Sequence, residues 1–254
     1  MSWLVPVASG EKWLDRCLDS IVNQSYKNWE AIVIINGKVK DNEYRNLKSK
    51  YINSDFKFKF YELEKKGMAN ALNFGLKHCK GDWIARLDAD DYSNQNRLEE
   101  QIKYTNYDLI FSNISSINEN NEVIYSTRGF QRIYKNKLPF LKKLHNQTLM
   151  SLSKYPKKYD IRDEFMFRNP IPHSSVLVRK KVLTDIGGYI SNKNGDNPCQ
   201  DLKTWLKLID EKIRIYQVDK ILTFISTHPH QVTGSSKANY ETFKIYLMLF
   251  FKYF

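Results

Sequence analysis

The sequence lacks the features that mark disulfide-stabilised, zinc-binding and membrane-spanning proteins. Its 254 residues include only three cysteines, Cys17, Cys79 and Cys199, which lie far apart and form no Cys-x-x-Cys pair. A disulfide framework and a structural zinc site are therefore not expected, and a reducing cytosol is favoured. No apolar run reaches the roughly 18 residues of a membrane span. Met1 leads directly into SWLVPVASG without a basic stretch, so no signal peptide is expected.

Internal repeats and linkers rich in proline, glycine and serine are also absent from the sequence, which indicates one domain. Hydrophobic residues make up 42% and charged residues 27%, an ordinary globular composition. The formal charge of +12 and the pI of about 9.4 favour anionic partners such as nucleic acid, an anionic membrane or phosphorylated substrates. The lysines are dispersed and no helix-turn-helix or RNA-binding motif accompanies them, so no nucleic-acid partner is predicted.

The first half of the chain alternates strand patterns with helix patterns. Strands are predicted at 3–8, 30–36, 56–63 and 83–88, and helices at 11–25, 41–51 and 68–79. The run EAIVIIN at 30–36 is continuously apolar, which is typical of a parallel strand buried on both faces. The alternation predicts an α/β fold with a doubly wound, mostly parallel sheet. Ligands of such sheets bind outside the carboxyl ends of the strands.

The second half is less regular. Two strands joined by an asparagine-rich turn are predicted at 108–126, a basic and mostly helical region at 130–168, a strand with a short helix at 173–189, a helix at 199–209, and strands at 214–218 and 221–226. The tail, 240–254, is apolar and too short to span a bilayer. Two interpretations of it are open: a helix that packs on the domain or on a partner, and a segment that lies in a membrane interface.

A cluster of carboxylates follows the predicted strand in the stretch WIARLDADDY. In an extended segment, Asp88 and Asp90 point to the same side and converge on one ligand. Two such oxygen donors suit Mg²⁺ or Mn²⁺, completed by water and substrate phosphates. Aspartate is also common in turns and at helix starts, and Asp91 is a candidate for that role, with Asn96 and Glu99 spaced like a capping box. An EF-hand is rejected because a strand, not a helix, precedes the cluster.

Four motifs resemble those of family 2 glycosyltransferases and follow in the family's order across residues 3–233. They are VPVASGEKWLDRCLDSIVNQSYKNWEAIVI, KKGMANALNFGLKHCKGDWIARLDADD, NPIPHSSVLVRKKVLTDIGGY and QDLKTWLKL with STHPHQVT. The family is inverting and nucleotide-sugar-dependent, and the branch with which the chain shares most builds bacterial capsule, O-antigen and lipooligosaccharide. The resemblance implies a GT-A fold with a Rossmann-like nucleotide-sugar-binding half at 1–110 and an acceptor half at 111–239, followed by the helical tail.

The resemblance also assigns roles around the donor. Asp88 and Asp90 are the DxD pair, with Asp90 a ligand of Mn²⁺ or Mg²⁺ and Asp88 on the ribose or on metal-bound water. His228, in STHPHQVT, is expected near the pyrophosphate, in the metal shell or on a phosphate, and a loop histidine without such a role is the alternative. The residues expected to bind the donor are Pro6, Val7, Ala8, Glu11, Asn36, Gly67, Arg86, Asp88 and Ala89. For Arg86, neutralising the acidic cluster is an alternative to touching substrate.

The resemblance gives the catalytic base as Asp201, which would take the proton of the acceptor hydroxyl. The family usually has Glu-Asp at this place, whereas this chain has Gln200 and Asp201. Asp201 also opens a predicted helix, so a role as N-cap is the alternative, and the helix amino end is expected to lower its pKa. Asp196 is the next candidate for the base. His173, in the third motif, is interpreted as a packed structural histidine.

A second departure from the family concerns the nucleotide. The family commonly has an Asp that pairs with uracil where this chain has Ile35, and Asn36 is either a base partner or a turn residue before glycine. A UDP-sugar remains the expected donor on family grounds, and a lipid-linked surface glycan the expected acceptor. We expect a cytoplasmic protein, in peripheral contact with the inner face of the cytoplasmic membrane if the tail binds lipid. The alternative to an enzyme is a catalytically silent sugar-nucleotide-binding or scaffold protein of the same fold.

Overall fold

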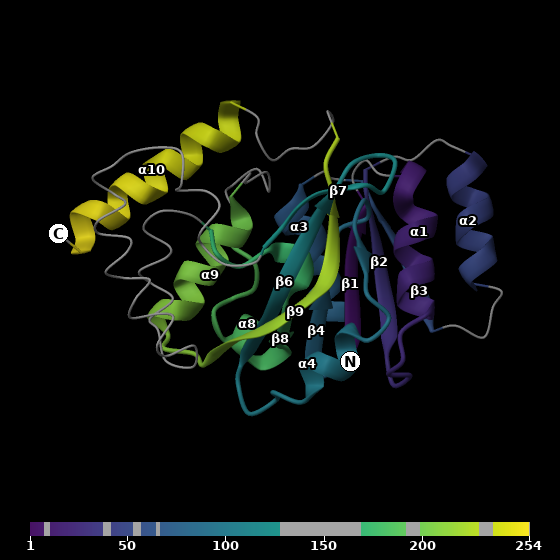
Figure 1. The fold of residues 1–254 in the computed structure, drawn as a ribbon, viewed down its shortest axis with the longest axis horizontal. Coiled ribbons are helices and arrows are strands. Elements are labelled where there is room, and N and C mark those ends of the chain that lie inside the picture. Colours follow the sequence, from purple (N-terminus) through teal and green to yellow (C-terminus); the bar gives the residue numbers. More distant parts are fainter. Residues whose placement is uncertain are drawn as a thin grey trace.

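A single mixed sheet forms the centre of the molecule, and helices cover both of its faces (Figure 1). The computed structural model describes residues 1–7, 11–37, 42–52, 57–64, 67–127, 169–191, 199–228 and 236–253. Within them the strands follow the order β3-β2-β1-β4-β8-β6-β9-β5, with β7 paired to β6. The predicted region 130–168 lies outside the described residues.

The first half has the predicted alternation of strands and helices. Its elements are β1 (Ser2–Val7), α1 (Glu11–Val22), β2 (Glu30–Asn36), α2 (Asn42–Ile52), β3 (Phe58–Leu63), α3 (Met68–His78) and β4 (Trp83–Arg86). All pairings among these strands are parallel, and residues Ala31 to Ile35 of β2 are fully buried. The continuously apolar sequence of β2 follows from this, because helices shield both faces of the strand. Pro6, which has no N–H to donate, lies past Leu4, the last residue of β1 that pairs with β4.

The second half changes strand direction. Its elements are β5 (Tyr92–Ser93), α4 (Arg97–Ile102), β6 (Leu109–Ile117), β7 (Val123–Ser126), the 3₁₀ helix η1 (His173–Ser175), β8 (Leu177–Arg179), α8 (Lys180–Asp185), α9 (Gln200–Asp210), β9 (Ile215–Ser226) and α10 (Ser236–Tyr253). Strand β8 lies antiparallel between β4 and β6, whereas β9 runs parallel to β6. The two short strands predicted at 214–218 and 221–226 are one strand, β9, with a register irregularity opposite Asn113.

The hydrophobic core has two layers, one on each face of the sheet. In β1, Leu4 joins the layer that contains α3 and α9, whereas Trp3 and Val5 join the layer that contains α1. This division follows from the alternation of side chains along a strand. The acidic turn described below begins where β4 ends, at the boundary between the parallel and antiparallel parts of the sheet.

Helix α10 has one packed face and one exposed apolar face. On the packed side Ile245 is buried in the core, and the Thr242 hydroxyl lies 3.2 Å from the Cys199 thiol at the start of α9. The packing-helix interpretation of the tail is therefore confirmed for this face. The outer residues, between 44% and 63% exposed, are Tyr240, Phe243, Leu247 and Met248. None of the helices in the described part of the chain is apolar enough over a sufficient length to cross a membrane.

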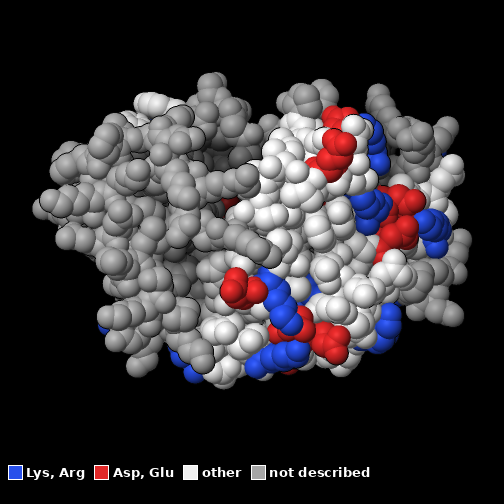
Figure 2. Space-filling view, viewed as in Figure 1, with Lys and Arg blue, Asp and Glu red and all other residues white. Residues whose placement is uncertain are grey.

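Charges of both signs are mixed over the face in Figure 2. On the described residues of this face, lysine and arginine side chains stand next to aspartate and glutamate side chains rather than in a broad patch of one sign. Ion pairs of this type join Lys12 with Glu119 and Lys220 with Glu100. Such exposed pairs contribute little to stability.

Candidate active site at the end of strand β4

The acidic residues form a turn, not the end of a strand. Strand β4 stops at Arg86, two residues earlier than predicted, and the Asp91 N–H donates to the Asp88 carbonyl over 3.1 Å. The extended conformation on which the prediction for Asp88 and Asp90 was based is therefore wrong, since both residues belong to a turn. We call residues Asp88 to Asp91 the acidic turn. Each of its carboxylates has its own set of partners.

Asp88 is held by a buried arginine. The Arg86 guanidinium pairs with Asp88 Oδ1, and the Ser174 hydroxyl lies 3.0 Å from Asp88 Oδ2. Burial raises the pKa of Asp88, but the charge of Arg86 and the hydrogen bonds from Arg86 and Ser174 contribute to a net shift below its ordinary value. The Arg86 side chain itself is unexposed and donates to the Leu4 and Leu87 carbonyls. From this position Arg86 neutralises the turn, and its assignment to donor binding is corrected.

Asp91 is the interior member of the acidic turn. It is 3% exposed, its Oδ1 accepts from the Ser226 N–H over 2.9 Å, and its Oδ2 contacts the Ser174 hydroxyl. Burial raises its pKa well above the ordinary value, and the charges of Asp90 and Asp88 raise it further. The suggested helix-start role for Asp91 is wrong, since its carboxylate is engaged here.

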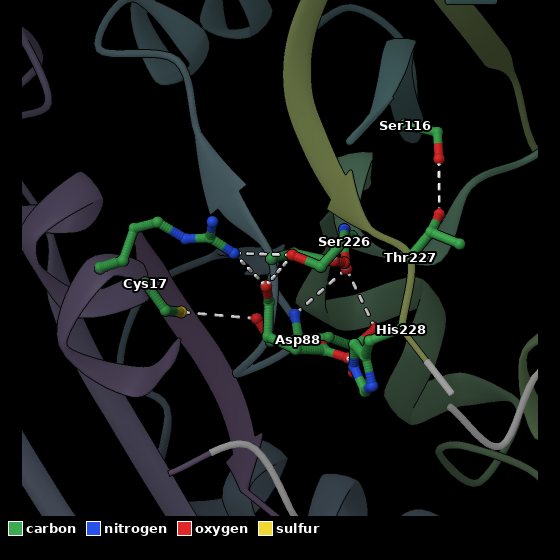
Figure 3. A network of polar contacts seen from close by, with 10 residues as sticks. Cys17, Asp88, Ser116, Ser226, Thr227 and His228 are labelled. Carbon is green, nitrogen blue, oxygen red and sulfur yellow. Dashed lines mark hydrogen bonds and ion pairs between the residues drawn. The ribbon is translucent and has the colours of Figure 1, made fainter. Parts of the chain in front are cut away.

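Asp90 faces the end of β9. His228 Nε2 lies 3.0 Å from Asp90 Oδ2, and the His228 ring stacks on Trp13 with centroids 4.3 Å apart. Figure 3 shows His228 beside the turn that carries Asp88. Burial raises the pKa of Asp90, and repulsion from Asp88 adds to this. The side chains of Asp88 and Asp90 are 28% and 22% exposed, so both carboxylates are open to a ligand, unlike Asp91.

The acidic turn has the chemistry of an Mg²⁺ or Mn²⁺ site that substrate completes. The Arg86 guanidinium pairs with Asp88, and the single hydroxyl hydrogen of Ser174 serves oxygens of both Asp88 and Asp91. Burial raises the pKa of Asp90, and the negative charge of Asp88 raises it further. The described residues contain no group of three or more metal-ligating side chains, so protein ligands alone do not fill a coordination shell. Mg²⁺ is commonly bound by one or two carboxylates, with waters and substrate phosphates.

The residues expected around the nucleotide lie at the ends of β1, β2 and β4. Val7 and Ala89 have buried side chains that pack in the core, and Pro6 is buried as well, so these three side chains do not face a ligand. Ala8 lies outside the described residues. Glu11 is the first residue of α1, and the structure describes its backbone only.

Asn36 is oriented towards Gly67. Its Oδ1 accepts from the Gly67 N–H over 2.9 Å, and this contact joins the end of β2 to the start of α3. Gly67 has φ 142°, a conformation that favours glycine. Ile35, at the place of the family's Asp, is fully buried in the core. Asn36 therefore holds Gly67 at the start of α3, a contact that differs from both roles suggested by the sequence.

Asp201 lies within reach of the charges of the acidic turn. It is the second residue of α9, whose N-cap is Cys199, so the N-cap interpretation of Asp201 is wrong. Asn169 Nδ2 donates to Asp201 Oδ2 over 2.8 Å. Burial raises the pKa of Asp201 and the charge of Asp88 raises it further, although the Leu202 N–H lowers it. The helix amino end does lower the pKa as expected, but burial outweighs it, so the expected net direction is wrong. Asp196 lies outside the described residues.

His173 is a packed histidine, as interpreted from the sequence. Its ring lies 5.6 Å from the Trp205 ring and 5.8 Å from the Tyr189 ring, measured between centroids. Burial lowers its pKa to about 3, with the charge of Arg86 as the next cause. The imidazole is therefore neutral at physiological pH.

Two residues of the site were not singled out from the sequence. Ser174 contacts Asp88 and Asp91, and Arg16 of α1 donates from Nη2 to the Asp90 carbonyl over 2.8 Å and to the Ser226 hydroxyl over 2.6 Å. Ser174 lies in the third motif, which was the available signal. Arg16 carried none, because a charged residue on the polar side of a helix is ordinarily solvated.

The family model described as Glycosyl transferase family 2 matches residues 2–171. Among curated proteins, the chain is 30% identical over 257 residues to the O-antigen biosynthesis glycosyltransferase WbnJ of Escherichia coli, a match that covers 99% of this chain and 89% of WbnJ. It is 28% identical over 233 residues to the bifunctional glycosyltransferase pgtA of Dictyostelium discoideum, where the match covers 87% of this chain and 30% of that protein.

Solved structures share the fold at lower identity. S. aureus TarS in complex with UDP has a TM-score of 0.64 at 18% identity, over 98% of this chain and 64% of that chain. The mannosyltransferase PcManGT from Pyrobaculum calidifontis, in complex with GDP-Man and Mn²⁺, has a TM-score of 0.60 at 17% identity, over 91% and 58% of the two chains. The chain thus spans less than two thirds of these solved structures. The predicted GT-A fold is confirmed.

Proposed function

This chain belongs to glycosyltransferase family 2, and from that membership we propose that it transfers a sugar, with inversion, from a nucleotide-sugar donor to a hydroxyl of a bacterial surface glycan. The transferred group is a hexosyl or N-acetylhexosaminyl residue. The first 110 residues hold the donor and residues 111–239 hold the acceptor. The acceptor class rests on the similarity to WbnJ, an O-antigen biosynthesis glycosyltransferase.

One observation carries the proposal: Asp88 of the acidic turn lies close enough to both Asp90 and Asp201 for its charge to act on each of them. Asp88 raises the pKa of both Asp90 and Asp201, although Asp201 is 111 positions after Asp90 in the chain. An inverting transfer needs these two functions near each other, since one face of the sugar carries the leaving phosphate and the other receives the acceptor hydroxyl.

Asp88 and Asp90 would hold Mg²⁺ or Mn²⁺, which when bound stabilises negative charge on the leaving diphosphate. Arg86 keeps Asp88 ionised, and Asn36 fixes the Gly67 loop beside the donor. His228 orients Asp90 through the 3.0 Å contact and is itself oriented by Trp13. Asp201 takes the proton of the acceptor hydroxyl, and its raised pKa makes it a stronger base than an ordinary aspartate.

The nucleotide we propose is UDP, and the acceptor is lipid-linked. TarS was solved with UDP and with UDP-GlcNAc, which supports this choice, whereas PcManGT was solved with GDP-Man. The buried Ile35 leaves no carboxylate for a uracil edge at the end of β2, so base recognition would fall to other residues.

The protein would work at the inner face of the cytoplasmic membrane. The exposed apolar face of α10 and the net charge of +12 together suit a reversible, salt-sensitive contact with anionic lipid. Such a contact would bring a lipid-linked acceptor to the acceptor half.

A donor screen tests the proposal. Release of nucleoside diphosphate is measured from UDP-, GDP- and dTDP-sugars with Mn²⁺, using the purified chain and a heat-denatured control. We expect release from UDP-sugars above the other classes. Tight binding of a donor without release or transfer to any glycan acceptor would instead identify a catalytically silent sugar-nucleotide-binding protein.

A further inference from the structure

Ser174 joins the acceptor half of the chain to the acidic turn. Its hydroxyl oxygen accepts from the Asp88 N–H over 3.1 Å, lies 3.0 Å from Asp88 Oδ2, and contacts Asp91 Oδ2. The residue is 1% exposed and 86 positions away from Asp88 in the chain. We propose that Ser174 is a positioning residue that keeps Asp91 turned inward and Asp88 turned outward, and so shapes the divalent-cation site. This inference rests on the proposed function.

A buried arginine fixes both sides of the contact between Ser174 and Asp88. Arg97 Nη1 donates to the Ser174 carbonyl over 2.6 Å, and Arg97 Nη2 donates to the carbonyls of Arg86 and Val176 over 3.0 and 2.9 Å. The Arg97 side chain is fully buried, with its guanidinium over the Trp3 ring. The Arg97 guanidinium therefore holds the carbonyl of Arg86, the last residue of β4, together with the carbonyls of Ser174 and Val176. The hydroxyl is placed on the turn by this frame, not by a flexible side chain.

The position of Ser174 decides which carboxylates face a ligand. Asp91 has two partners, the Ser174 hydroxyl and the Ser226 N–H, and both draw it into the protein. Without the hydroxyl, Oδ2 of the buried Asp91 carboxylate loses its hydrogen-bond donor. The Asp91 carboxylate would then rotate, and the backbone of the acidic turn would shift with it. The exposed pair, Asp88 and Asp90, would no longer present oxygens in a fixed arrangement.

The same helical turn offers a matched control. Ser175 is buried like Ser174, and its hydroxyl donates to the Pro172 carbonyl over 2.9 Å and accepts from the Ser112 N–H over 3.4 Å. None of these partners belongs to the acidic turn. Ser175→Ala therefore removes a buried hydroxyl from η1 and leaves the turn intact, which separates general damage to η1 from a specific effect on the turn.

The test is Mn²⁺ binding to the full chain in the presence of UDP, followed by electron paramagnetic resonance of free Mn²⁺. We expect Ser174→Ala to raise the dissociation constant of Mn²⁺ at least about tenfold, the effect of losing one hydrogen bond to a charged group. Ser175→Ala should bind within about twofold of wild type, the change left when no contact to the acidic turn is lost. Circular dichroism and the Tm without Mn²⁺ establish that each variant is folded.

Three results would overturn the inference. Equal Mn²⁺ binding by Ser174→Ala and wild type would show that the hydroxyl does not shape the site, and the proposed function would stand. Equal weakening in both alanine variants would show that η1 acts only as a whole. Absence of Mn²⁺ binding by the wild type would instead overturn the metal-dependent function, and the inference with it. Should Ser174→Ala fail to fold, Ser174→Cys, with a weak donor of similar shape, is judged by the same criterion.

Discussion

Burial raises the pKa of the Asp201 carboxylate and so changes its effect on stability and its strength as a base. The side chain accepts from Asn169 over 2.8 Å, yet loss of hydration and repulsion from Asp88 keep its pKa above the ordinary value. Because the unfolded chain has the lower pKa, the ionised carboxylate destabilises the fold once the pH rises above the unfolded value. A structural N-cap would have the opposite effect on stability. Such a loss of folding stability is expected for a carboxylate whose role is catalytic rather than structural.

Asp201→Asn keeps the shape of the side chain and removes the proton acceptor. We expect sugar transfer to slow by at least about 10²-fold, the lower end for loss of a general base, with donor affinity unchanged. Urea unfolding at pH 7 should show a variant at least as stable as wild type. Wild-type transfer should fall as the pH drops through the raised pKa of Asp201.

Glu211→Gln, at the exposed carboxyl end of α9, is the matched control and should transfer normally. Normal turnover of Asp201→Asn would show that the base is another residue.

The limits of sequence-based prediction at this scale are visible in Asp88, Asp90 and Ser174. The residue types and spacing of the first two indicated a metal site, but not the turn that separates their partners. Their contacts come from residues 86 and 138 positions away, which no local pattern encodes. The pKa of Asp201 was predicted in the wrong direction for the same reason, since burial by distant segments outweighs the local helix amino end.

At the scale of elements, α3 and the loop after α8 are joined by one side chain. Asn73 of α3 accepts from the Tyr189 N–H over 2.7 Å and donates to the Tyr189 carbonyl over 2.8 Å. Gly187 and Gly188, which precede Tyr189, both have positive φ, 86° and 89°. A Cβ on Gly188 would lie 2.3 Å from Asn73 Oδ1, whereas a Cβ on Gly187 would meet nothing within 4 Å. The contact with Asn73 therefore explains why residue 188 is glycine, and the positive φ explains why both Gly187 and Gly188 are glycine.

The two glycines give a controlled prediction. Gly187→Ala should destabilise the protein by about 1–2 kcal/mol, the strain of a left-handed alanine. Gly188→Ala carries the same strain and also displaces Asn73, so it should cost at least about 1 kcal/mol more, the value of a lost hydrogen bond with its desolvation. Urea denaturation at constant pH measures both. Equal losses in the two variants would show that Asn73 does not clamp the loop.

Prediction of whole elements was better where the pattern is local. The apolar run of β2 and the stripe of α1 are fixed by neighbours a few residues away; β2 has the predicted bounds, and α1 begins at the predicted residue but ends at Val22, three residues early. Strand β9 was divided in two because Asp219 and Lys220 interrupt its apolar pattern, whereas parallel pairing with β6 carries it through with an irregular register.

At the scale of the whole molecule, α10 adds an apolar outer face to a strongly basic protein. Phe243→Asp with Leu247→Asp places charge on that face without touching the buried Ile245. We expect the double variant to lose most of its sedimentation with vesicles of anionic phospholipid at low salt, because apolar contact and lysine attraction act together. The wild type should be released by raised salt.

Val123→Asp with Ile124→Asp is the control, since these residues of β7 are 60% and 50% exposed and lie in another element. Equal sedimentation of the α10 double variant and wild type would leave α10 as a packing helix alone.

The central claim is that the acidic turn binds the divalent metal ion needed for sugar transfer. A metal titration of sugar-donor cleavage tests this claim most directly. Nucleoside diphosphate release is measured for wild type, Asp90→Asn and Asp82→Asn, an exposed residue before β4, first in EDTA and then with increasing Mn²⁺. We predict no release by wild type in EDTA, and full recovery with Mn²⁺ in wild type and in Asp82→Asn. Release by Asp90→Asn should be at least about 10²-fold lower, because metal stabilisation of a leaving group is worth several kcal/mol. Full release by wild type in EDTA, or an Asp90→Asn titration that matches wild type, would contradict the account.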